Sequence, residues 1–241
     1  MSTDVAESEV VTNVRDRLAL ALDVDDLVAA TRIARELKPY FGVAKIGLEL
    51  FSANGPDAVG ALADMGFEVF LDAKLHDIPT TVEKASRVLG ALGVNYLTLH
   101  AFGGAEMLRA GVTGLADGAE KAGLAPPTAL AVTVLTSDDT APSHILSKRV
   151  QAALEGHCGG IICAASDVHE ARQYAPRFRM VVPGIRLEGD SSHDQTRVSS
   201  PRAAVEAGAD MLVIGRSVTA AEDPAAAAAR VVAEVEAALA D

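Results

Sequence analysis

A cluster of charged residues follows a short apolar stretch near residue 70. Residues 69–71 are Val, Phe and Leu, and they precede Asp72, Lys74 and Asp77. Side chains alternate along a strand, so we expect Asp72 and Lys74 to point the same way, with Asp77 following in a loop. Charges at the end of a buried strand cost free energy unless each has a partner, so such a cluster indicates chemistry. An Asp–Lys pair that merely closes the strand end is the structural alternative, but it does not explain two carboxylates around one lysine.

The two carboxylates also restrict what the amine of Lys74 can do. A lysine that forms a Schiff base must be neutral, and burial or nearby cations favour that form. The flanking carboxylates act in the opposite direction and keep the amine protonated. We therefore expect Lys74 to donate a proton or to neutralise anionic charge that develops on a substrate.

Short apolar stretches alternate with amphipathic helical patterns along the chain. We expect strands over residues 18–23, 42–47, 69–71, 96–100, 129–135, 160–164, 180–185 and 211–215. The expected helices cover residues 25–37, 54–65, 80–92, 104–121, 143–154, 168–174 and 224–239. Eight β/α units of roughly 25 residues with continuous apolar strands predict an α/β fold, a single (β/α)8 TIM barrel. An open doubly wound sheet would carry a Gly-rich fingerprint after its first strand, and residues 23–26 have none.

The domain organisation follows from the same pattern. Residues 1–14 are expected to form a flexible N-terminal tail, and residues 15–241 a single barrel that carries the catalytic site. The polar segment 186–201 is rich in Gly, Asp, Ser and His and is too long for a plain connector, so we interpret it as a functional loop.

Polar residues gather at the predicted carboxyl ends of the strands, where barrels of this kind have their active sites. Besides the cluster at residues 72–77, these residues are Asp23, Lys45, His100, Thr136, Ser137, Arg186, Gly215 and Arg216. The charged members alternate in sign, so each can have a neighbour of opposite charge that keeps it ionised despite burial.

The last strand ends in a pattern typical of a phosphate site. Gly215 and Arg216 stand where barrels commonly bind phosphate through backbone N–H groups, and Arg186 on the preceding loop can add a forked hydrogen bond. A helix-start glycine beside a surface arginine is the alternative, which the Pro-Gly-Ile-Arg run at 183–186 makes less attractive.

Composition excludes several classes of function. The 241 residues carry a formal net charge of -12, which disfavours nucleic-acid and anionic-membrane binding. No apolar run approaches the roughly 20 residues that a membrane helix needs, and the polar, acidic start shows no signal peptide, so a cytoplasmic location is expected. Cys158 and Cys163 resemble reduced core residues, and no metal-ligand spacing is visible. The charged cluster at residues 72–77, the phosphate pattern after the last strand and the lack of metal-ligand spacing together indicate an acid/base enzyme without metal or other cofactor. Its expected substrate is a small phosphorylated anion.

The run Asp-Ala-Lys-Leu-His-Asp-Ile-Pro-Thr-Thr at 72–81 closely resembles the signature of the orotidine 5′-monophosphate decarboxylase family. Further segments resemble that family in the right order over nearly the whole chain after residue 16. They are Ala21–Asp23, Lys45–Gly47, Val132–Ser137, Pro183–Arg186, Asp194–Val198 and Ile214–Ser217.

The resemblance implies cofactor-free decarboxylation of orotidine 5′-monophosphate to UMP and a role for each matched residue. Asp72 would face the substrate carboxylate, Lys74 would protonate the ring carbon that loses carbon dioxide, and Lys45 and Asp77 would complete the charged array. The other implied contacts are Asp23 and Lys45 to the ribose, Thr136 or Ser137 to the pyrimidine, Gln195 between base and phosphate, and Arg186, Gly215 and Arg216 to the phosphate. The resemblance also implies a homodimer in which Asp77 and Thr81 reach the partner's site, while His100 stays a neighbour without an assigned role.

Two other functions are compatible with the same motif. Related barrels that are magnesium-dependent decarboxylases or synthases of keto-sugar phosphates share the Asp-x-Lys-x-x-Asp run but have a glutamate that helps hold the metal where this chain has Lys45. A lysine there would repel the cation, which disfavours that function. A non-catalytic nucleotide-binding barrel is the second alternative, and the complete charged array argues against it.

Overall fold

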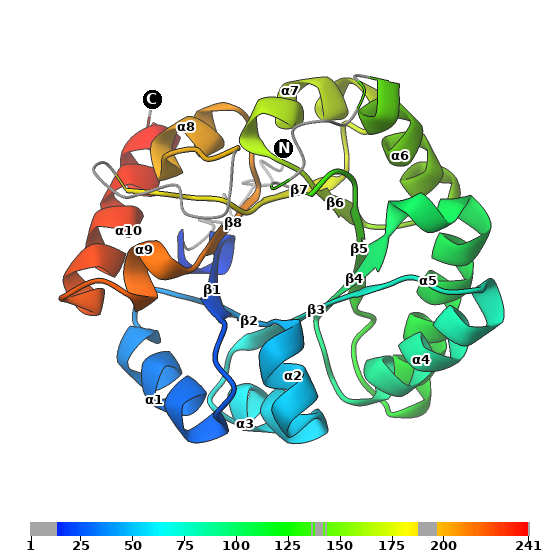
Figure 1. Ribbon diagram of the computed structural model, residues 1–241, viewed down its shortest axis with the longest axis horizontal. Helices are drawn as coiled ribbons and strands as arrows, with labels where there is room; N and C mark the ends of the chain where they lie inside the picture. The colour runs from blue at the N-terminus through cyan, green and yellow to red at the C-terminus, as the bar shows by residue number, and fades with distance from the viewer. Residues whose placement is uncertain (1–13, 136, 138–141, 143, 188–196, 241) are drawn as a thin grey trace, which may run out of the picture.

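The chain forms a closed barrel of eight parallel strands surrounded by helices (Figure 1). The computed structural model describes residues 14–135, 137, 142, 144–187 and 197–240. Each strand pairs with the next one in chain order, and the last pairs with the first. The strands are β1 Leu18–Leu22, β2 Val43–Ile46, β3 Glu68–Leu75, β4 Tyr96–His100, β5 Thr128–Val132, β6 Gly160–Ile162, β7 Arg179–Val182 and β8 Met211–Ile214. The predicted single (β/α)8 barrel is therefore confirmed.

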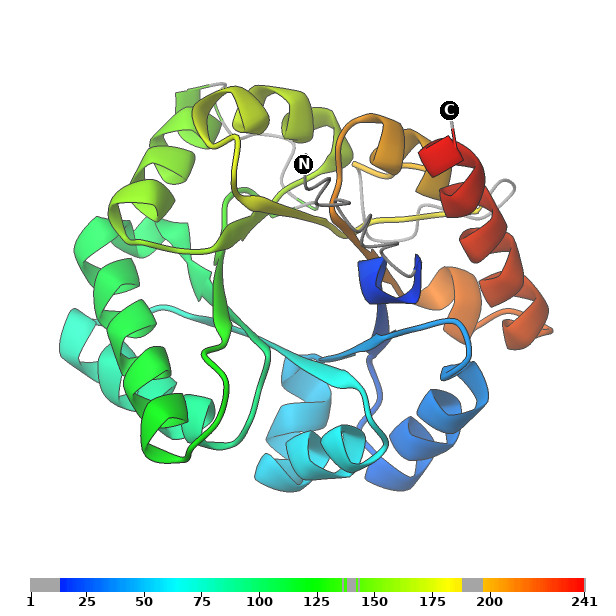
Figure 2. The same ribbon diagram turned by 180° about the vertical axis from the view of Figure 1, so that it is seen from behind.

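The helices form an outer ring, which both views of the molecule show (Figures 1 and 2). The α-helices are α1 Leu27–Leu37, α2 Leu48–Asn54, α3 Pro56–Asp64, α4 Pro79–Ala91, α5 Gly104–Lys121, α6 His144–Glu155, α7 Ala165–Tyr174, α8 Pro201–Glu206, α9 Arg216–Thr219 and α10 Pro224–Ala240. Two short 3-10 helices, η1 Val14–Arg17 and η2 Ala101–Gly103, precede β1 and α5.

Alternation along the strands divides the core into two layers. On β1, Leu18, Leu20 and Leu22 pack outward against the helices, whereas Ala19 and Ala21 face the barrel interior with residues of the other strands. The inner layer is filled by Ala19, Ala21, Val43, Phe70, Tyr96, Leu130, Val132, Ile162, Val181, Met211 and Val213. A filled interior of this kind is a packed core and leaves only the ends of the strands for a site.

The same alternation places charged residues inside the barrel at one end. Val43 and Phe70 belong to the inner layer, so Lys45 and Asp72, each two residues further along, also face inward. In the register of the sheet, Lys45 stands between Ala21 of β1 and Phe70 of β3. Lys45 and Asp72 therefore lie just above the apolar inner layer, at the carboxyl ends of neighbouring strands.

Several predicted boundaries differ from the structure. The helix predicted over residues 54–65 corresponds to α3, but the separate helix α2 before it was not predicted; the two are divided at Gly55, whose φ of 56° no right-handed helix allows. Pro56 then starts α3, a first-turn position where its missing N–H costs nothing. The third strand is longer than its apolar run and continues through Leu75, whereas the fifth ends at Val132 rather than at residue 135. The short α8 and α9 were not predicted.

The N-terminal boundary stays a prediction, since residues 1–13 lie outside the described residues and Val14 already belongs to η1. Figure 2 shows η1 beside the end of the barrel from which β1 starts. Among the helices that the structure describes, none combines the length and apolar character needed to cross a membrane.

Candidate active site

A cavity of about 180 Å³ lies at the carboxyl ends of the strands. One wall is charged and comes from β1, β2 and β3, and the floor is apolar, with Phe70, Val132 and Ile162 from the inner layer. The opposite wall comes from the segments after β7 and β8 and carries two arginines. The charged wall consists of Asp23, Lys45, Asp72 and Lys74, and the opposite wall of Pro183, Gly184, Arg186, Gly215 and Arg216.

The charged wall is one connected array of alternating sign. Nζ of Lys74 lies 2.8 Å from Oδ2 of Asp72, and Nζ of Lys45 lies 3.7 Å from the same oxygen. Lys45 also donates to Oδ1 of Asp23 at 3.1 Å. Each ammonium group therefore has a carboxylate neighbour, and Asp72 lies between both, which is the arrangement that lets charges persist at a mostly buried site.

Asp72 is further held by Thr98 of β4. The Thr98 hydroxyl donates to Oδ1 of Asp72 at 2.9 Å and accepts the backbone N–H of Lys74 at 2.8 Å. Burial alone would raise the pKa of Asp72. The ammonium groups of Lys45 and Lys74 and the hydrogen bonds from Lys74 and Thr98 outweigh burial and hold this pKa below its ordinary value. Asp72 is thus a carboxylate at neutral pH.

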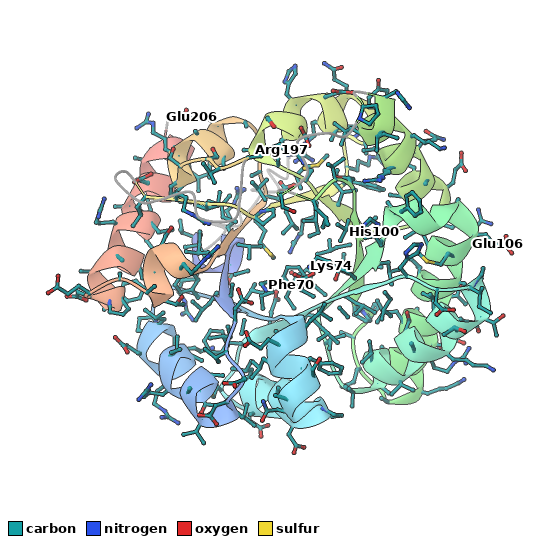
Figure 3. The ribbon with its side chains drawn as sticks, viewed as in Figure 1. Phe70, Lys74, His100, Glu106, Arg197 and Glu206 are labelled. Carbon is teal, nitrogen blue, oxygen red and sulfur yellow. The ribbon has the colours of Figure 1, made fainter. Side chains whose placement is uncertain are left out.

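The backbone at Lys74 is left-handed, with φ of 48°. This conformation is uncommon for a residue with a side chain and costs roughly 1–2 kcal/mol. It falls where the pairing of β3 with β4 shifts register between Leu71 and Leu75. In Figure 3, Phe70 and Lys74 lie within the ring of strands, whereas Glu106 lies out on the ring of helices. Backbone strain at a charged residue that faces a cavity is typical of a functional position.

Gly47 leaves the space in which Asp23 and Lys45 meet. A Cβ atom at this position would lie 2.8 Å from Oδ1 of Asp23 and 3.3 Å from Nζ of Lys45. Any larger residue would therefore displace the pair, so the glycine at the end of β2 is part of the architecture of the charged wall.

The opposite wall is built from buried main chain and two cations. Arg186 is almost fully buried and donates to the carbonyl oxygen of Ile185 at 2.8 Å. The Ser217 hydroxyl donates to the same carbonyl at 3.2 Å and so connects the segment after β7 to α9. Gly215 precedes Arg216, the first residue of α9, and both line the cavity. Two guanidinium groups beside a helix start can bind an anion such as phosphate.

Some predicted site residues lie away from the cavity. Asp77 and Thr81 are exposed at the start of α4, and the Asp77 carboxylate accepts the N–H of Ile78 at 2.7 Å. Ser137 is exposed and does not line the cavity. Thr136 and Gln195 fall outside the described residues.

His100 also lies outside the cavity lining. Its Nδ1 accepts the N–H of Phe102 at 3.2 Å, and its ring centroid lies 5.7 Å from that of His76. Burial lowers the pKa of His100, and electrostatic interaction with Arg149, His76 and Lys74 lowers it further. These contacts indicate that His100 is a neutral imidazole that stabilises η2 through its hydrogen bond to Phe102.

Sequence reasoning missed two residues that belong to the construction of the site. Thr98 is fully buried on β4 and contacts Asp72, and Arg197 binds the main chain at Val134 and Leu135, which line the cavity. The one signal available for Thr98 was its place as a single polar residue in the apolar run of β4. It lies two positions after Tyr96, which faces the barrel interior, so Thr98 faces inward too. Arg197 lies in the segment 194–198 that resembles the family, but no role was assigned to it.

The chemistry of this site follows from its charges. A lysine ammonium group held against a carboxylate, at the edge of an apolar floor, can stabilise an anion that forms in the cavity and transfer a proton to it. Among the described residues, no group of three or more His, Cys, Asp or Glu side chains has an arrangement suited to a metal ion.

The comparisons with known proteins agree on one family. Residues 16–231 match the model of the orotidine 5′-phosphate decarboxylase / HUMPS family. The chain is 45% identical over 224 residues to a protein of Anaeromyxobacter sp. (strain K) named orotidine 5′-phosphate decarboxylase, covering 88% of this chain and 95% of that one. A protein of the same name from Paramagnetospirillum magneticum is 42% identical over 227 residues, covering 90% and 97%. Among solved structures, orotidine 5′-phosphate decarboxylase from Lactobacillus acidophilus superposes with a TM-score of 0.78 at 33% identity, covering 91% and 99%.

Proposed function

The chain belongs to the orotidine 5′-phosphate decarboxylase / HUMPS family, and we propose that it decarboxylates orotidine 5′-monophosphate to UMP in pyrimidine biosynthesis. The observation that carries the proposal is the position of Lys74, whose ammonium nitrogen lies 2.8 Å from Asp72 at the cavity. The two arginines of the opposite wall supply what a phosphate monoester would need. The names of relatives at 42–45% identity support this activity over others of the family.

The proposed mechanism uses only side chains of the charged wall. Loss of carbon dioxide breaks the bond between the carboxylate and the pyrimidine ring and leaves the electron pair on the ring carbon. The Lys74 ammonium group stabilises that negative charge as it forms and then transfers a proton to the carbon, which yields UMP. Lys74 regains its proton from solvent. Asp72, next to the substrate carboxylate, keeps Lys74 in place, and Lys45 completes the array within one subunit. Asp77, which lies away from this cavity, would join the array of a neighbouring subunit in a dimer.

The remaining substrate contacts follow the layout of the cavity. We assign the ribose hydroxyls to Asp23 and Lys45, which stand together at the ends of β1 and β2. The phosphate is assigned to Arg186, Gly215 and Arg216 on the opposite wall. Thr136 or Ser137 remains the proposed pyrimidine contact, and Gln195 the proposed bridge between base and phosphate. A phosphorylated nucleotide does not cross membranes unaided, so a cytoplasmic location fits this substrate.

A metal-dependent reaction on a keto-sugar phosphate is the nearest competing function. Such a reaction would place a divalent cation among the carboxylates at the ends of β1 to β3. Nζ of Lys45 lies 3.1 Å from Asp23 and 3.7 Å from Asp72, so its charge would repel a cation bound between them. The position of Lys45 therefore favours the decarboxylase.

One assay separates the three functions. The loss of orotidine monophosphate absorbance is followed with and without EDTA, for the wild-type chain and for Lys74→Ala. We expect turnover that EDTA does not change, and a loss of roughly 10²–10³-fold or more in Lys74→Ala with an unchanged circular dichroism spectrum. Turnover abolished by EDTA would support the metal-dependent alternative, and nucleotide binding without release of carbon dioxide would support a non-catalytic barrel.

We also propose that the chain works as a homodimer with a shared site. Asp77 and Thr81 lie at an exposed edge that also carries large apolar side chains, with Ile78 66% and Phe102 69% exposed. The ring of Phe102 contacts that of His76, so these side chains form one surface next to the charged wall. A partner subunit that covers this edge would bury the apolar side chains and bring Asp77 to the neighbouring site.

Mixing inactive variants tests the shared site. Lys74→Ala and Asp77→Ala are each expected to be inactive alone, whereas a mixed dimer has one site with both residues intact. Random exchange of subunits should therefore restore roughly a quarter of wild-type turnover. A monomer in analytical ultracentrifugation, or no recovery in a dimer shown to exchange subunits, would contradict the proposal.

A further inference from the structure

The guanidinium group of Arg197 joins separate parts of the barrel rim. Nη1 donates to Oδ2 of Asp167, in the first turn of α7, at 2.6 Å. Nη2 donates to the carbonyl oxygens of Val134 at 3.4 Å and Leu135 at 3.2 Å, just beyond β5. The Arg197 side chain is 22% exposed and that of Asp167 17%, so this contact is largely shielded from water. Figure 3 shows Arg197 at the rim, near α7.

The main chain beside Arg197 belongs to the opposite wall of the cavity. Ser199 donates its N–H to the carbonyl oxygen of Gly184 at 3.1 Å and accepts the N–H of Arg186 at 2.9 Å. Gly184 and Arg186 both line the cavity, as do Val134 and Leu135. The main chain two residues after Arg197 is therefore fixed to the wall after β7, while the Arg197 side chain binds the main chain after β5, which also lines the cavity.

We propose that Arg197, oriented by Asp167, is a positioning residue that fixes the separation of these two walls for the substrate. The inference rests on the proposed function and deepens it. It states that a residue outside the cavity lining aligns the phosphate and the pyrimidine of the bound nucleotide. With the phosphate held by the wall after β7, the main chain after β5 must stand at a fixed distance for the pyrimidine to reach Lys74. A displacement of about 1 Å far from the reacting atoms can reduce turnover roughly 10²-fold.

Arg172, which lies on α7 like Asp167, provides a matched control. Its Nη2 donates to Oδ2 of Asp210 at 2.7 Å, and its Nη1 donates to the carbonyl oxygen of Phe178 at 2.7 Å. It is thus an arginine with one carboxylate and main-chain acceptors, as Arg197 is. These acceptors precede β7 and β8, so Arg172 lies at the other end of the barrel and contacts neither wall of the cavity.

The experiment compares Arg197→Ala, Arg172→Ala and the wild type in steady-state kinetics with orotidine monophosphate and in calorimetric titration with UMP. We expect Arg197→Ala to lose about 10–10²-fold in kcat/KM, through a lower kcat as well as a higher KM, and to bind UMP more weakly. Arg172→Ala should lower the melting temperature but leave KM and the UMP dissociation constant within about twofold of wild type. Unchanged KM and UMP binding in Arg197→Ala, or equal kinetic losses in both variants, would overturn the proposal.

A second variant keeps the test informative if Arg197→Ala folds poorly. Arg197→Lys retains a cation that can reach Asp167 but lacks the fork that binds both carbonyl groups. The same rise in KM is expected in this variant, and a wild-type KM would show that the carbonyl bonds do not position the substrate. A wild-type chain that does not release carbon dioxide would contradict the proposed function itself. An active wild type whose KM and UMP binding do not change on substitution of Arg197 would contradict only the positioning role.

Discussion

The ammonium nitrogen of Lys74 lies 2.8 Å from a carboxylate oxygen of Asp72, two positions earlier on the same strand. In a regular strand the Cα atoms of such residues lie roughly 6.6 Å apart and their side chains run parallel. Here the register shift between Leu71 and Leu75 and the left-handed φ of Lys74 interrupt the regular strand at this pair. The contact that carries the proposed chemistry thus coincides with a local departure from regular sheet geometry.

The strain at Lys74 predicts an unusual stability order for two substitutions. Lys74→Gly and Lys74→Ala both remove the ion pair with Asp72, but only alanine retains a Cβ in the left-handed conformation. The free energy of unfolding should therefore be about 1 kcal/mol higher for Lys74→Gly than for Lys74→Ala, measured by urea denaturation. Ala85→Gly in the interior of α4 is the control and should lose about 1 kcal/mol. A glycine variant no more stable than the alanine variant would show that the position is unstrained.

Thr98 should matter to both stability and turnover although it does not line the cavity. Thr98→Val keeps the shape but leaves the Lys74 N–H and one Asp72 oxygen without this partner, at a cost of about 1–3 kcal/mol in unfolding free energy. Because Asp72 loses its orientation, kcat/KM should fall roughly 10–10²-fold. Thr133→Val, which removes a similar hydrogen bond to the Ile162 carbonyl, should lose stability but not turnover. Equal kinetics in the two variants would contradict the role of Thr98.

The sequence predicted what depends on local pattern. Regular spacing of apolar strands predicted the barrel. The charged residues that end those strands predicted an array of Asp23, Lys45, Asp72, Lys74 and Asp77, because side chains that alternate in a closed parallel sheet meet at its carboxyl end. Asp77 alone of these five does not line the cavity. The helix α2 was missed because its 7 residues are too few to show a clear helical period. The proposed roles of Thr136 and Gln195 stay predictions.

Residues whose partners lie far along the chain could not be found in this way. Thr98 contacts Asp72 across 26 positions, and Arg197 reaches Val134 across 63. Neither spacing corresponds to a helical or strand period, so only the closed barrel brings these residues together. The register shift in β3 is also a property of the pairing between two strands, which no single stretch of sequence displays.

The packing of α4 on α5 predicts a steep cost for one small substitution. A Cβ atom at Gly118 of α5 would lie 1.9 Å from the carbonyl oxygen of Arg87 on α4, so the helices would have to separate. We expect Gly118→Ala to lower the free energy of unfolding by about 1–3 kcal/mol. Gly60→Ala on α3 is the matched control. A Cβ atom there would have no neighbour within 4 Å among the described residues outside its own helix turn, so helix propensity should raise stability by about 0.5–1 kcal/mol. Similar melting temperatures for the two variants would contradict this close packing.

The lowered pKa of Asp72 predicts its part in the acid stability of the fold. A carboxyl group whose pKa is lower in the folded than in the unfolded chain stabilises the fold at pH values above the unfolded value, here 3.8. That contribution is lost as the pH falls through the lower folded value, since protonation ends the attraction to Lys45 and Lys74. In Asp72→Asn the contribution is absent at every pH. Its free energy of unfolding, measured by urea denaturation, should thus fall less between pH 6 and about pH 3 than that of the wild type. Asp64→Asn removes an exposed carboxylate at the end of α3 and should follow the wild-type curve. An Asp72→Asn curve parallel to the wild type would mean that Asp72 titrates alike in the folded and unfolded chain, and the ion pairs with the two lysines would then contribute nothing to stability.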